Sequence, residues 1–218
     1  MSARRRRSDL RASLRALAGP GTLDERVRAF DLAADRHLDR VRGNPAVDRA
    51  FYTASELGDF SVIWQFFAVV RGLRRDGDLA GTARLLSAVG LESALVNGPI
   101  KSLFRRPRPT TVAAIPRPHR LRQPKTSSFP SGHASAATVF VVVASERDSW
   151  WPIYAAVGAC VAISRAHVRI HHASDVVGGV VVGALLGGLF RWWWPADRAL
   201  PRGLPMGSTA AASTGDER

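Results

Sequence analysis

The sequence predicts an all-α protein: a membrane helix bundle with about five transmembrane helices and an N-terminal amphipathic helix. Five stretches of the chain are almost free of charged residues, at 50–70, 85–100, 127–145, 149–164 and 176–194. A helix needs roughly 17 to 25 mostly apolar residues to cross a bilayer. Tryptophan clusters open the fourth stretch and close the fifth, as aromatic anchors at a membrane interface do. These clusters favour bilayer crossings over the buried helices of a soluble protein.

The segment before the first apolar stretch carries charges of both signs. Apolar residues recur in it near helical spacing, at Leu23, Val27, Phe30, Ala34, Leu38 and Val41. This pattern predicts an amphipathic helix. Such a helix lies on a membrane surface or packs on its own domain, and the pattern is consistent with both.

Glycine occupies every fourth position of the last apolar stretch, at Gly179, Gly183 and Gly187. Small residues at this spacing let two helices approach closely in lipid. Because each glycine costs a soluble helix about 1 kcal/mol relative to alanine, a packing role is the economical explanation. We expect this stripe to contact a neighbouring helix.

Three acidic residues interrupt the first two apolar stretches, at Glu56, Asp59 and Glu92. A carboxylate is costly in hydrocarbon, so these side chains are expected to face protein, water or a basic partner. We interpret them as hydrogen-bonding groups between helices rather than as catalytic groups.

The charge of the chain is strongly basic, with 31 Lys and Arg residues against 18 Asp and Glu residues. Most of the positive charge is arginine, whose guanidinium group makes forked contacts with phosphate. A phosphate-bearing or anionic partner is therefore expected. The single cysteine, Cys160, excludes an internal disulfide and has no companion for a zinc site.

Three polar segments lie at or just beyond the ends of apolar stretches, at 101–109, 129–133 and 164–175. With five alternating crossings, all three fall on one membrane face. The tryptophan clusters fall on the opposite face. Charged residues at such positions meet water while helices anchor them.

The third polar segment has the composition of a nucleophilic site. His171 and Asp175 are four residues apart, so they share one side of a helical turn. The carboxylate would orient the imidazole and stabilise positive charge on it. An imidazole held in this way can attack phosphorus and carry the phosphoryl group. His133, which follows a Pro-Ser-Gly turn, would then serve as the general acid and later activate water.

Basic residues in the same segments would stabilise the charge on the phosphoryl oxygens. The residues with this expected role are Lys101, Arg108 and Arg165. Further arginines nearby are interpreted as a face toward solvent or lipid headgroups: Arg105, Arg106, Arg117, Arg120 and Arg122.

A metal site is the alternative for the histidines, because His167 and His171 are also four residues apart. The sequence has no H-E-x-x-H motif and no cysteine pair, and Asp175 is the only carboxylate within the three segments. We therefore expect neither a metal nor another cofactor.

The three segments together resemble the signature of a known family. The patterns K-x-x-x-x-x-x-R-P, P-S-G-H and S-R-x-x-x-x-x-H-x-x-x-D are complete here. They are similar to the three-part signature of the type 2 phosphatidic acid phosphatase superfamily. That superfamily also includes bacterial polyprenyl-pyrophosphate phosphatases, glucose-6-phosphatase and vanadium haloperoxidases. The resemblance covers roughly residues 50 to 194.

The resemblance implies an all-helical enzyme that hydrolyses a lipid phosphate monoester or pyrophosphate, of the phosphatidic acid or polyprenyl phosphate type. It implies a phosphohistidine on His171 and acid–base work by His133, without a metal. It also implies phosphate contacts from Lys101, Arg108, Ser131, Gly132 and Arg165. The expected partners are the lipid substrate and the bilayer, with no nucleic acid, and the expected location is the plasma membrane.

The domain organisation predicted from these features has three parts. Residues 1–49 form a basic N-terminal segment with the amphipathic helix, residues 50–194 form the membrane phosphatase domain, and residues 195–218 form a disordered tail. Members of the membrane branch usually have six spans, whereas five are counted here. Either the first span is missing or the amphipathic helix replaces it.

Two rival functions remain open at this point. A vanadium-dependent haloperoxidase would use the same oxyanion cradle. A non-catalytic protein that binds anionic lipid would use the arginine-rich face, although it leaves the pairing of His171 with Asp175 unexplained. The membrane face that carries the site is also open, because the positive-inside tendency points to the cytoplasm and most membrane relatives expose their sites outward.

Overall fold

All regular structure in the described residues, 22–109 and 126–197 of the computed structural model, is helical. The α-helices in these ranges are α2 (Leu23–Asp39), α3 (Pro45–Leu57), α4 (Val62–Arg74), α5 (Leu79–Leu95), α6 (Gly132–Ala144), α7 (Trp151–His167) and α8 (Ala173–Trp193). Two short turns, η1 (Asp59–Ser61) and η2 (Val96–Ile100), continue α3 and α5. The all-α prediction is confirmed. Residues 1–21 of the predicted basic segment and 198–218 of the predicted tail lie outside the described residues.

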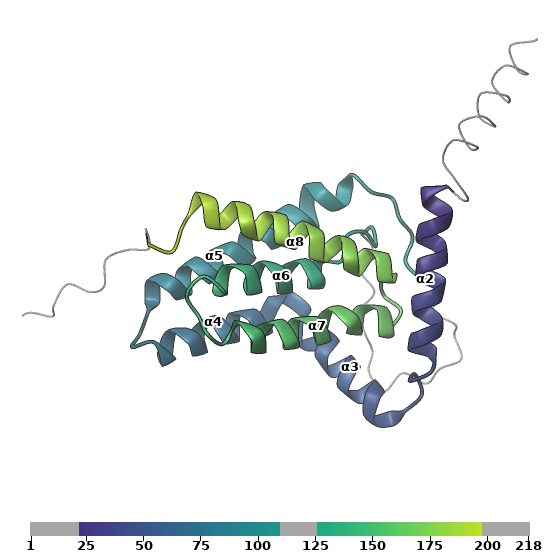
Figure 1. Cartoon of the computed structure of the whole chain (residues 1–218), viewed down its shortest axis with the longest axis horizontal. Coiled ribbons are helices and arrows are strands. Elements are labelled where there is room, and N and C mark those ends of the chain that lie inside the picture. Colours follow the sequence, from purple (N-terminus) through teal and green to yellow (C-terminus); the bar gives the residue numbers. More distant parts are fainter. Residues whose placement is uncertain (1–21, 110–125, 198–218) are drawn as a thin grey trace, which may run out of the picture.

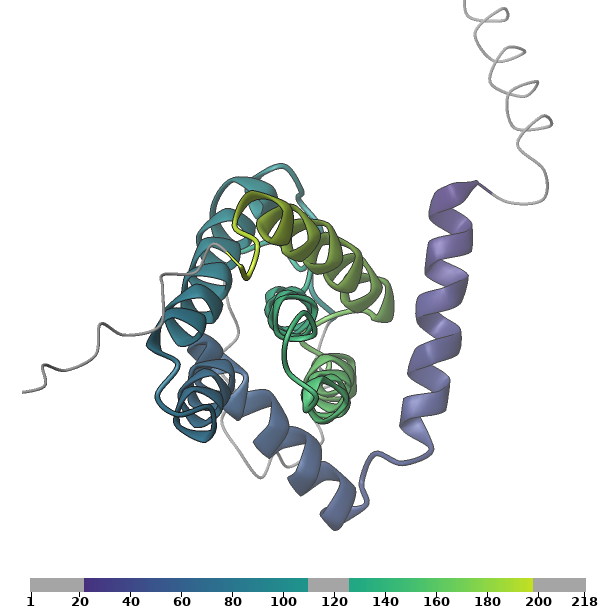
Figure 2. The same cartoon turned by 60° about the vertical axis from the view of Figure 1, so that its left-hand side comes forward.

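The helices form a bundle around α6, and α2 stands across one end of it (Figure 1). Figure 2 shows the same bundle with α6 surrounded by its neighbours and α2 to one side. The predicted amphipathic helix is present as α2, where Thr22 caps the N-terminus and accepts a hydrogen bond from the backbone of Glu25 at 3.3 Å. Each of the five apolar stretches is helical over most of its length.

Aromatic side chains from three helices fill the centre of the bundle. Trp64 of α4, Phe140 of α6 and Tyr154 of α7 are buried almost completely. The ring centroids of Trp64 and Phe140 are 5.3 Å apart, and those of Phe140 and Tyr154 are 5.2 Å apart. Such pairs add to the stability that burial of their apolar area supplies. They hold α4 and α7 in place around α6.

The glycine stripe of α8 packs directly against α6, as predicted. A Cβ atom at Gly179 would lie 2.4 Å from the carbonyl oxygen of Ser131, and one at Gly183 would lie 2.5 Å from that of Ser135. At Gly187 the nearest atom would be the Cβ of Val142, at 3.0 Å. Only glycine permits this approach of the two backbones.

The apolar stretch 50–70 is divided by a break between α3 and α4. Phe60 and Ser61 have φ angles of 53° and 59°, in the left-handed region that ends a right-handed helix. Gly58, just before them, lies against the ring of His133, and a Cβ atom there would be 2.5 Å from the imidazole Cδ2. The absence of a side chain at Gly58 therefore makes room for the ring of His133, which belongs to the second polar segment.

Apolar side chains line the outside of the bundle. Phe66, Leu185 and Leu189 are 61%, 69% and 58% exposed. In the described part of the chain, two helical segments are long and apolar enough to cross a membrane, Leu79–Ile100 and Ala173–Trp193. A large exposed apolar surface of this kind is typical of contact with lipid.

Charged and aromatic groups close the end of the bundle that lies away from α2. Arg74 pairs with Asp148 at 2.6 Å, and its guanidinium lies 4.1 Å from the ring centroid of Trp150. Arg84 donates a hydrogen bond to the carbonyl of Trp194 at 2.7 Å. The start of α7 at Trp151 and the end of α8 at Trp193 lie at this end (Figure 1), so the two tryptophan clusters share it, as the alternation of crossings predicted.

The contact between α6 and α8 predicts opposite effects for two glycine substitutions. Gly183→Ala should lower the free energy of unfolding by about 1–3 kcal/mol, because its methyl group overlaps the Ser135 carbonyl. Gly188→Ala is the matched control: nothing lies within 4 Å of its Cβ position, so it should be neutral or stabilising. Thermal unfolding in detergent would compare the two. Equal midpoints would contradict the packing role of the stripe.

Candidate active site

The three polar segments meet at the end of the bundle that α2 crosses. The first follows η2, the second leads into α6, and the third joins α7 to α8. Backbone hydrogen bonds connect them: Ser131 N donates to the Asp175 carbonyl at 3.0 Å, and Ser128 N donates to the Arg106 carbonyl at 3.0 Å. The Arg108 side chain donates to the Ile170 carbonyl at 3.0 Å. The predicted convergence of distant segments is present in the structure.

His171 lies in the turn between α7 and α8, with its side chain 3% exposed. The turn bends sharply at Arg169, whose φ of 57° is in the left-handed region. His171 Nδ1 is 3.6 Å from Asp175 Oδ2, and His171 Nε2 is 3.2 Å from Arg108 Nη1. The two ring nitrogens therefore face a carboxylate and a guanidinium group.

The imidazole of His171 is held in its neutral form. Burial, followed by the positive charges of Arg108 and Arg165, lowers the pKa of His171 to about 3, although Asp175 acts in the opposite direction. A neutral imidazole with Nδ1 facing a carboxylate favours the tautomer that carries its proton on Nδ1 and a lone pair on Nε2. Arg108 Nη1, 3.2 Å from Nε2, is placed to donate a hydrogen bond to that lone pair.

Asp175 is fully buried and belongs to the first turn of α8. Its Oδ2 accepts a hydrogen bond from the backbone of His172 at 2.8 Å, which caps the helix. Its Oδ1 accepts one from Arg106 Nη1 at 2.6 Å. The carboxylate is thus fixed by its own helix and by the first polar segment.

Lys101 lies against the N-terminus of α6. It donates a hydrogen bond to Asn97 Oδ1 at 2.9 Å, and a Cβ atom at Gly132 would be 3.5 Å from Lys101 Nζ. Burial and the nearby charge of Arg108 lower the pKa of Lys101 to about 8. The positive end of the α6 dipole and the lysine together favour an anion at this point.

His133 and Arg165 share a carboxylate that the sequence analysis did not place in the site. His133 Nε2 is 3.0 Å from Asp59 Oδ1, and Arg165 Nη1 is 3.9 Å from the same atom. Arg165 also donates to the hydroxyl of Ser55. Asp59 thus faces a basic partner, as expected of a carboxylate in an apolar stretch, but that partner belongs to the candidate site.

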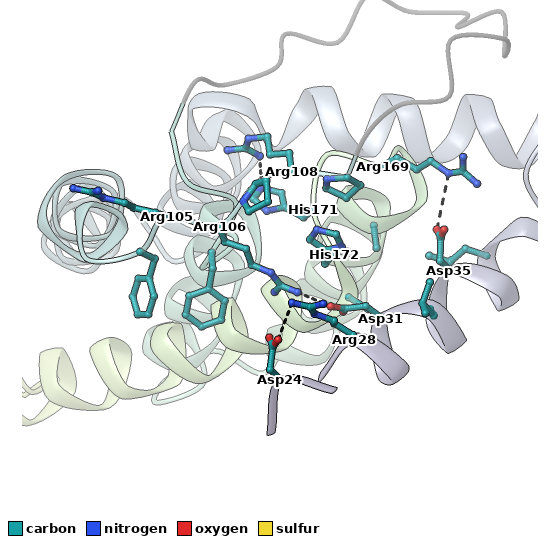
Figure 3. Close-up of a pocket in the computed structure, with 18 residues that line it drawn as sticks. Asp24, Arg28, Asp31, Asp35, Arg105, Arg106, Arg108, Arg169, His171 and His172 are labelled. Carbon is teal, nitrogen blue, oxygen red and sulfur yellow. Dashed lines mark hydrogen bonds and ion pairs between the residues drawn. The ribbon is translucent and has the colours of Figure 1, made fainter. Parts of the chain in front are cut away.

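A cavity of about 1240 Å³ lies between α2 and the turns that carry the site. Figure 3 shows His171, Arg108 and Arg106 on one side of it and the side chains of α2 on the other. Its lining mixes acidic and basic groups with apolar ones such as Phe104 and Leu32. His171 therefore lies in the wall of a space much larger than a phosphate group.

One sequence-based interpretation of an individual residue was wrong, and a rejected alternative for another is also not seen. Arg106 does not belong to a solvated face, because its guanidinium contacts Asp175 and also Asp31 of α2, at 2.5 Å. His167 turns away from the site and pairs with Asp48 of α3 at 2.8 Å. Spacing along the chain could not reveal either partner.

No three His, Cys, Asp or Glu side chains cluster in a way that could hold a metal ion within 22–109 and 126–197. The alternative metal pair, His167 and His171, does not form. His167 contacts Asp48, and His171 faces Asp175. The charged groups near His171 are Asp175 on one side and the guanidinium groups of Arg108 and Arg165 on the other.

The fold and the site define a helical protein with a buried histidine between a carboxylate and cationic side chains. The sequence matches the profile of the PAP2 superfamily over residues 81–199, more than half of the chain. The chain therefore belongs to the PAP2 superfamily, and the resemblance seen in its motifs is confirmed.

Curated relatives are phosphatases of lipid-linked substrates. The chain is 31% identical over 131 residues to a lipid A 1-phosphatase of Porphyromonas gingivalis, covering 56% of this chain but only 27% of that protein. It is 28% identical over 141 residues to the decaprenylphosphoryl-5-phosphoribose phosphatase of Mycobacterium tuberculosis, covering 62% of this chain and 73% of that protein. The predicted enzyme class, a phosphoric monoester hydrolase, agrees with both relatives.

Two solved structures share the fold. A transmembrane PAP2-type phosphatidylglycerolphosphate phosphatase of Bacillus subtilis has a TM-score of 0.56 at 23% identity, over 82% of this chain and 89% of that one. LpxE of Aquifex aeolicus has a TM-score of 0.56 at 24% identity, over 73% and 93%. With the exposed apolar surface described above, this likeness agrees with an integral membrane protein.

The lowered pKa of Lys101 predicts how the site binds inorganic phosphate. Lys101 attracts the anion only while it is protonated, so affinity should fall as the pH rises through about 8. Lys101→Arg keeps its charge over this range and should remove the alkaline loss. Calorimetric titration with phosphate from pH 7.5 to 9.5 would measure the difference. The same alkaline loss in both proteins would exclude Lys101 as its source.

Proposed function

We propose that this protein hydrolyses the phosphate monoester or pyrophosphate of a lipid through a phosphohistidine on His171. The observation that carries the proposal is the placement of the two ring nitrogens. Nδ1 faces the buried carboxylate of Asp175, while Nε2 faces the guanidinium of Arg108 beside a large cavity. This placement suits a nucleophile with a phosphate-binding cation next to its reacting atom.

In the first step, Nε2 of His171 attacks phosphorus and the bond from phosphorus to the lipid oxygen breaks. The imidazole becomes cationic as it takes up the phosphoryl group. Asp175 is placed to stabilise this charge through Nδ1. The 3.6 Å separation is longer than a hydrogen bond in the free protein and is expected to shorten as the charge develops.

His133 is assigned the proton transfers. It donates a proton to the departing lipid oxygen in the first step. It then takes a proton from water, whose oxygen attacks phosphorus as the bond to Nε2 breaks and inorganic phosphate is released. Asp59, 3.0 Å from its ring, would hold the imidazole in place and support its protonated form.

The oxygens of the phosphoryl group are assigned to the cations and to the start of α6. Lys101 and Arg165 are buried, and Arg108 bridges to the His171 turn. Ser131 and Gly132 begin α6, where backbone amides and the helix dipole favour negative charge. Charge stabilisation of this kind supplies much of the catalysis when a phosphoryl group is transferred.

A lipid substrate is supported by the apolar outside of the bundle and by the relatives. The cavity beside His171 would receive the headgroup while the acyl or isoprenoid chain stays among the exposed apolar side chains. The relatives act on lipid A and on a decaprenyl-linked phosphoribose, so their shared chemistry is a phosphate ester on a long-chain lipid. The proposed location is the plasma membrane.

Phosphate release from a panel of lipid phosphates in detergent tests the reaction. The panel contains phosphatidic acid, a polyprenyl phosphate and a polyprenyl pyrophosphate, each with and without EDTA. The parent should release phosphate equally in both conditions, whereas His171→Ala and His133→Ala should lose at least about a hundredfold in kcat. An acid-labile, alkali-stable phosphoryl label should form on the parent and be absent from His171→Ala. Full activity in His171→Ala, or loss with EDTA that added metal restores, would overturn the mechanism.

The contact with Asp59 predicts a separate effect on proton transfer. Asp59→Asn should lower kcat by about tenfold or more, because His133 loses a charged partner. Asp76→Asn is the matched control, since Asp76 is exposed in the turn between α4 and α5. If the two variants had equal kcat and equal pH profiles, Asp59 would have no part in the reaction.

A further inference from the structure

Asp31 is an unusual residue within α2. Most of this helix is exposed, yet Asp31 is the residue of α2 that is buried, at 8% exposure. Aspartate is almost never buried without a partner, because removing a charge from water is costly. Its burial therefore indicates a specific set of contacts.

These contacts join α2 to the first turn of α8. Asp31 Oδ1 accepts a hydrogen bond from Ser174 N at 2.8 Å, and Asp31 Oδ2 accepts one from Ser174 Oγ at 2.8 Å. Ser174 N is one of the amides at a helix start that have no partner within their own helix. A carboxylate from α2 thus caps α8 one residue before Asp175.

The second contact of Asp31 is the guanidinium group of Arg106. Arg106 Nη2 donates to Asp31 Oδ2 at 2.5 Å, while Arg106 Nη1 donates to Asp175 Oδ1 at 2.6 Å and to Ser174 Oγ at 2.7 Å. One arginine therefore bridges the carboxylate of α2 and the carboxylate that faces His171. Figure 3 shows Asp31 and Arg106 meeting beside His172.

Without Asp31, Arg106 would reduce the electrostatic stabilisation that Asp175 gives to a positively charged His171. A positive charge at 2.6 Å would offset the negative charge that Asp175 presents to His171. With Asp31 also present, the two carboxylates and the guanidinium carry a net charge of −1, the same as Asp175 by itself. The arginine then fixes the position of Asp175 without cancelling its charge.

Further contacts hold α2 in this position. Arg42, in the turn after α2, donates to the carbonyls of Ala166 and His167 at 2.8 Å each, at the end of α7. Asp39 of α2 pairs with Arg169 at 2.6 Å, in the turn that leads to His171. The helix is therefore attached to both sides of the turn that carries His171.

We infer that Asp31 is a positioning residue for the proposed hydrolysis, and that α2 is part of the catalytic apparatus. The inference rests on the proposed function. Asp31 balances the charge of Arg106 and caps α8, so that Asp175 is fixed and fully charged opposite His171. The helix that carries it lies outside the residues matched by the family profile, 81–199.

The test compares Asp31→Asn with Asp76→Asn, a control whose side chain is exposed in the turn between α4 and α5, away from the cavity beside His171. Both are assayed for kcat and KM on the lipid phosphate that the parent hydrolyses fastest. Asp31→Asn should lower kcat about tenfold with KM changed by less than twofold, and Asp76→Asn should match the parent. Equal kcat in the two variants would overturn the inference.

The double variant Asp31→Asn/Arg106→Gln separates charge balance from simple support of the fold. With Gln in place of Arg106, no uncompensated positive charge offsets the negative charge of Asp175. The double variant should therefore be more active than Asp31→Asn alone. A purely structural role predicts the reverse, because the double variant loses more contacts. An activity equal to or below that of the single variant would overturn the charge argument.

Hydrogen exchange provides a measurement that does not depend on activity. Peptides that cover the first turn of α8 should exchange faster in Asp31→Asn than in the parent or in Asp76→Asn. The neutral amide oxygen is a weaker acceptor for Ser174 N than the carboxylate, and the new NH2 group cannot accept from Arg106. If the parent hydrolysed no lipid phosphate, the proposed function would fail, while exchange would still decide whether Asp31 holds α8. Unchanged exchange in Asp31→Asn would overturn that role.

Discussion

The close approach of α6 to α8 is the contact on which the rest of the site depends. Gly179 lies against the carbonyl of Ser131, and the amide of Ser131 donates to the carbonyl of Asp175 at 3.0 Å. Because the two backbones are in direct contact, the start of α6 and the start of α8 are held in fixed register. The amides at the start of α6, which we propose bind phosphate, and the carboxylate of α8 that faces His171 are therefore held in place by the protein itself, before any substrate arrives.

Several cationic side chains of the site are buried close together, and nearby carboxylates balance part of their positive charge. Lys101 and Arg165 are 7% and 2% exposed, and Arg108 lies beside His171. Burying such charges costs free energy unless partners satisfy them. Asp59 and Asp175 supply part of that compensation. In the proposed function, a bound phosphate group would supply more of it.

The helix α2 combines the two interpretations that its amphipathic pattern allowed. It packs on its own domain, but through polar residues, since Asp31 contacts α8 and Asp39 contacts Arg169. Its apolar residues Leu23 and Phe30 remain 78% and 48% exposed. A helix that crosses the end of a membrane bundle with apolar side chains outward is suited to the bilayer surface. This arrangement would place the cavity beside His171 near the lipid interface.

The sequence by itself determined the helical class, the amphipathic helix, the glycine contact and the family, because periodicity, charge-free length and motif spacing are local properties of the chain. It also identified which residue types could bind phosphate. Only the tertiary structure decided which carboxylates pair with the histidines and arginines of the site. Asp59 and Asp31 are far in sequence from His133 and Arg106, and His167 turned to Asp48 rather than toward His171. Such partners depend on how helices from distant parts of the chain pack, and no local pattern encodes that geometry.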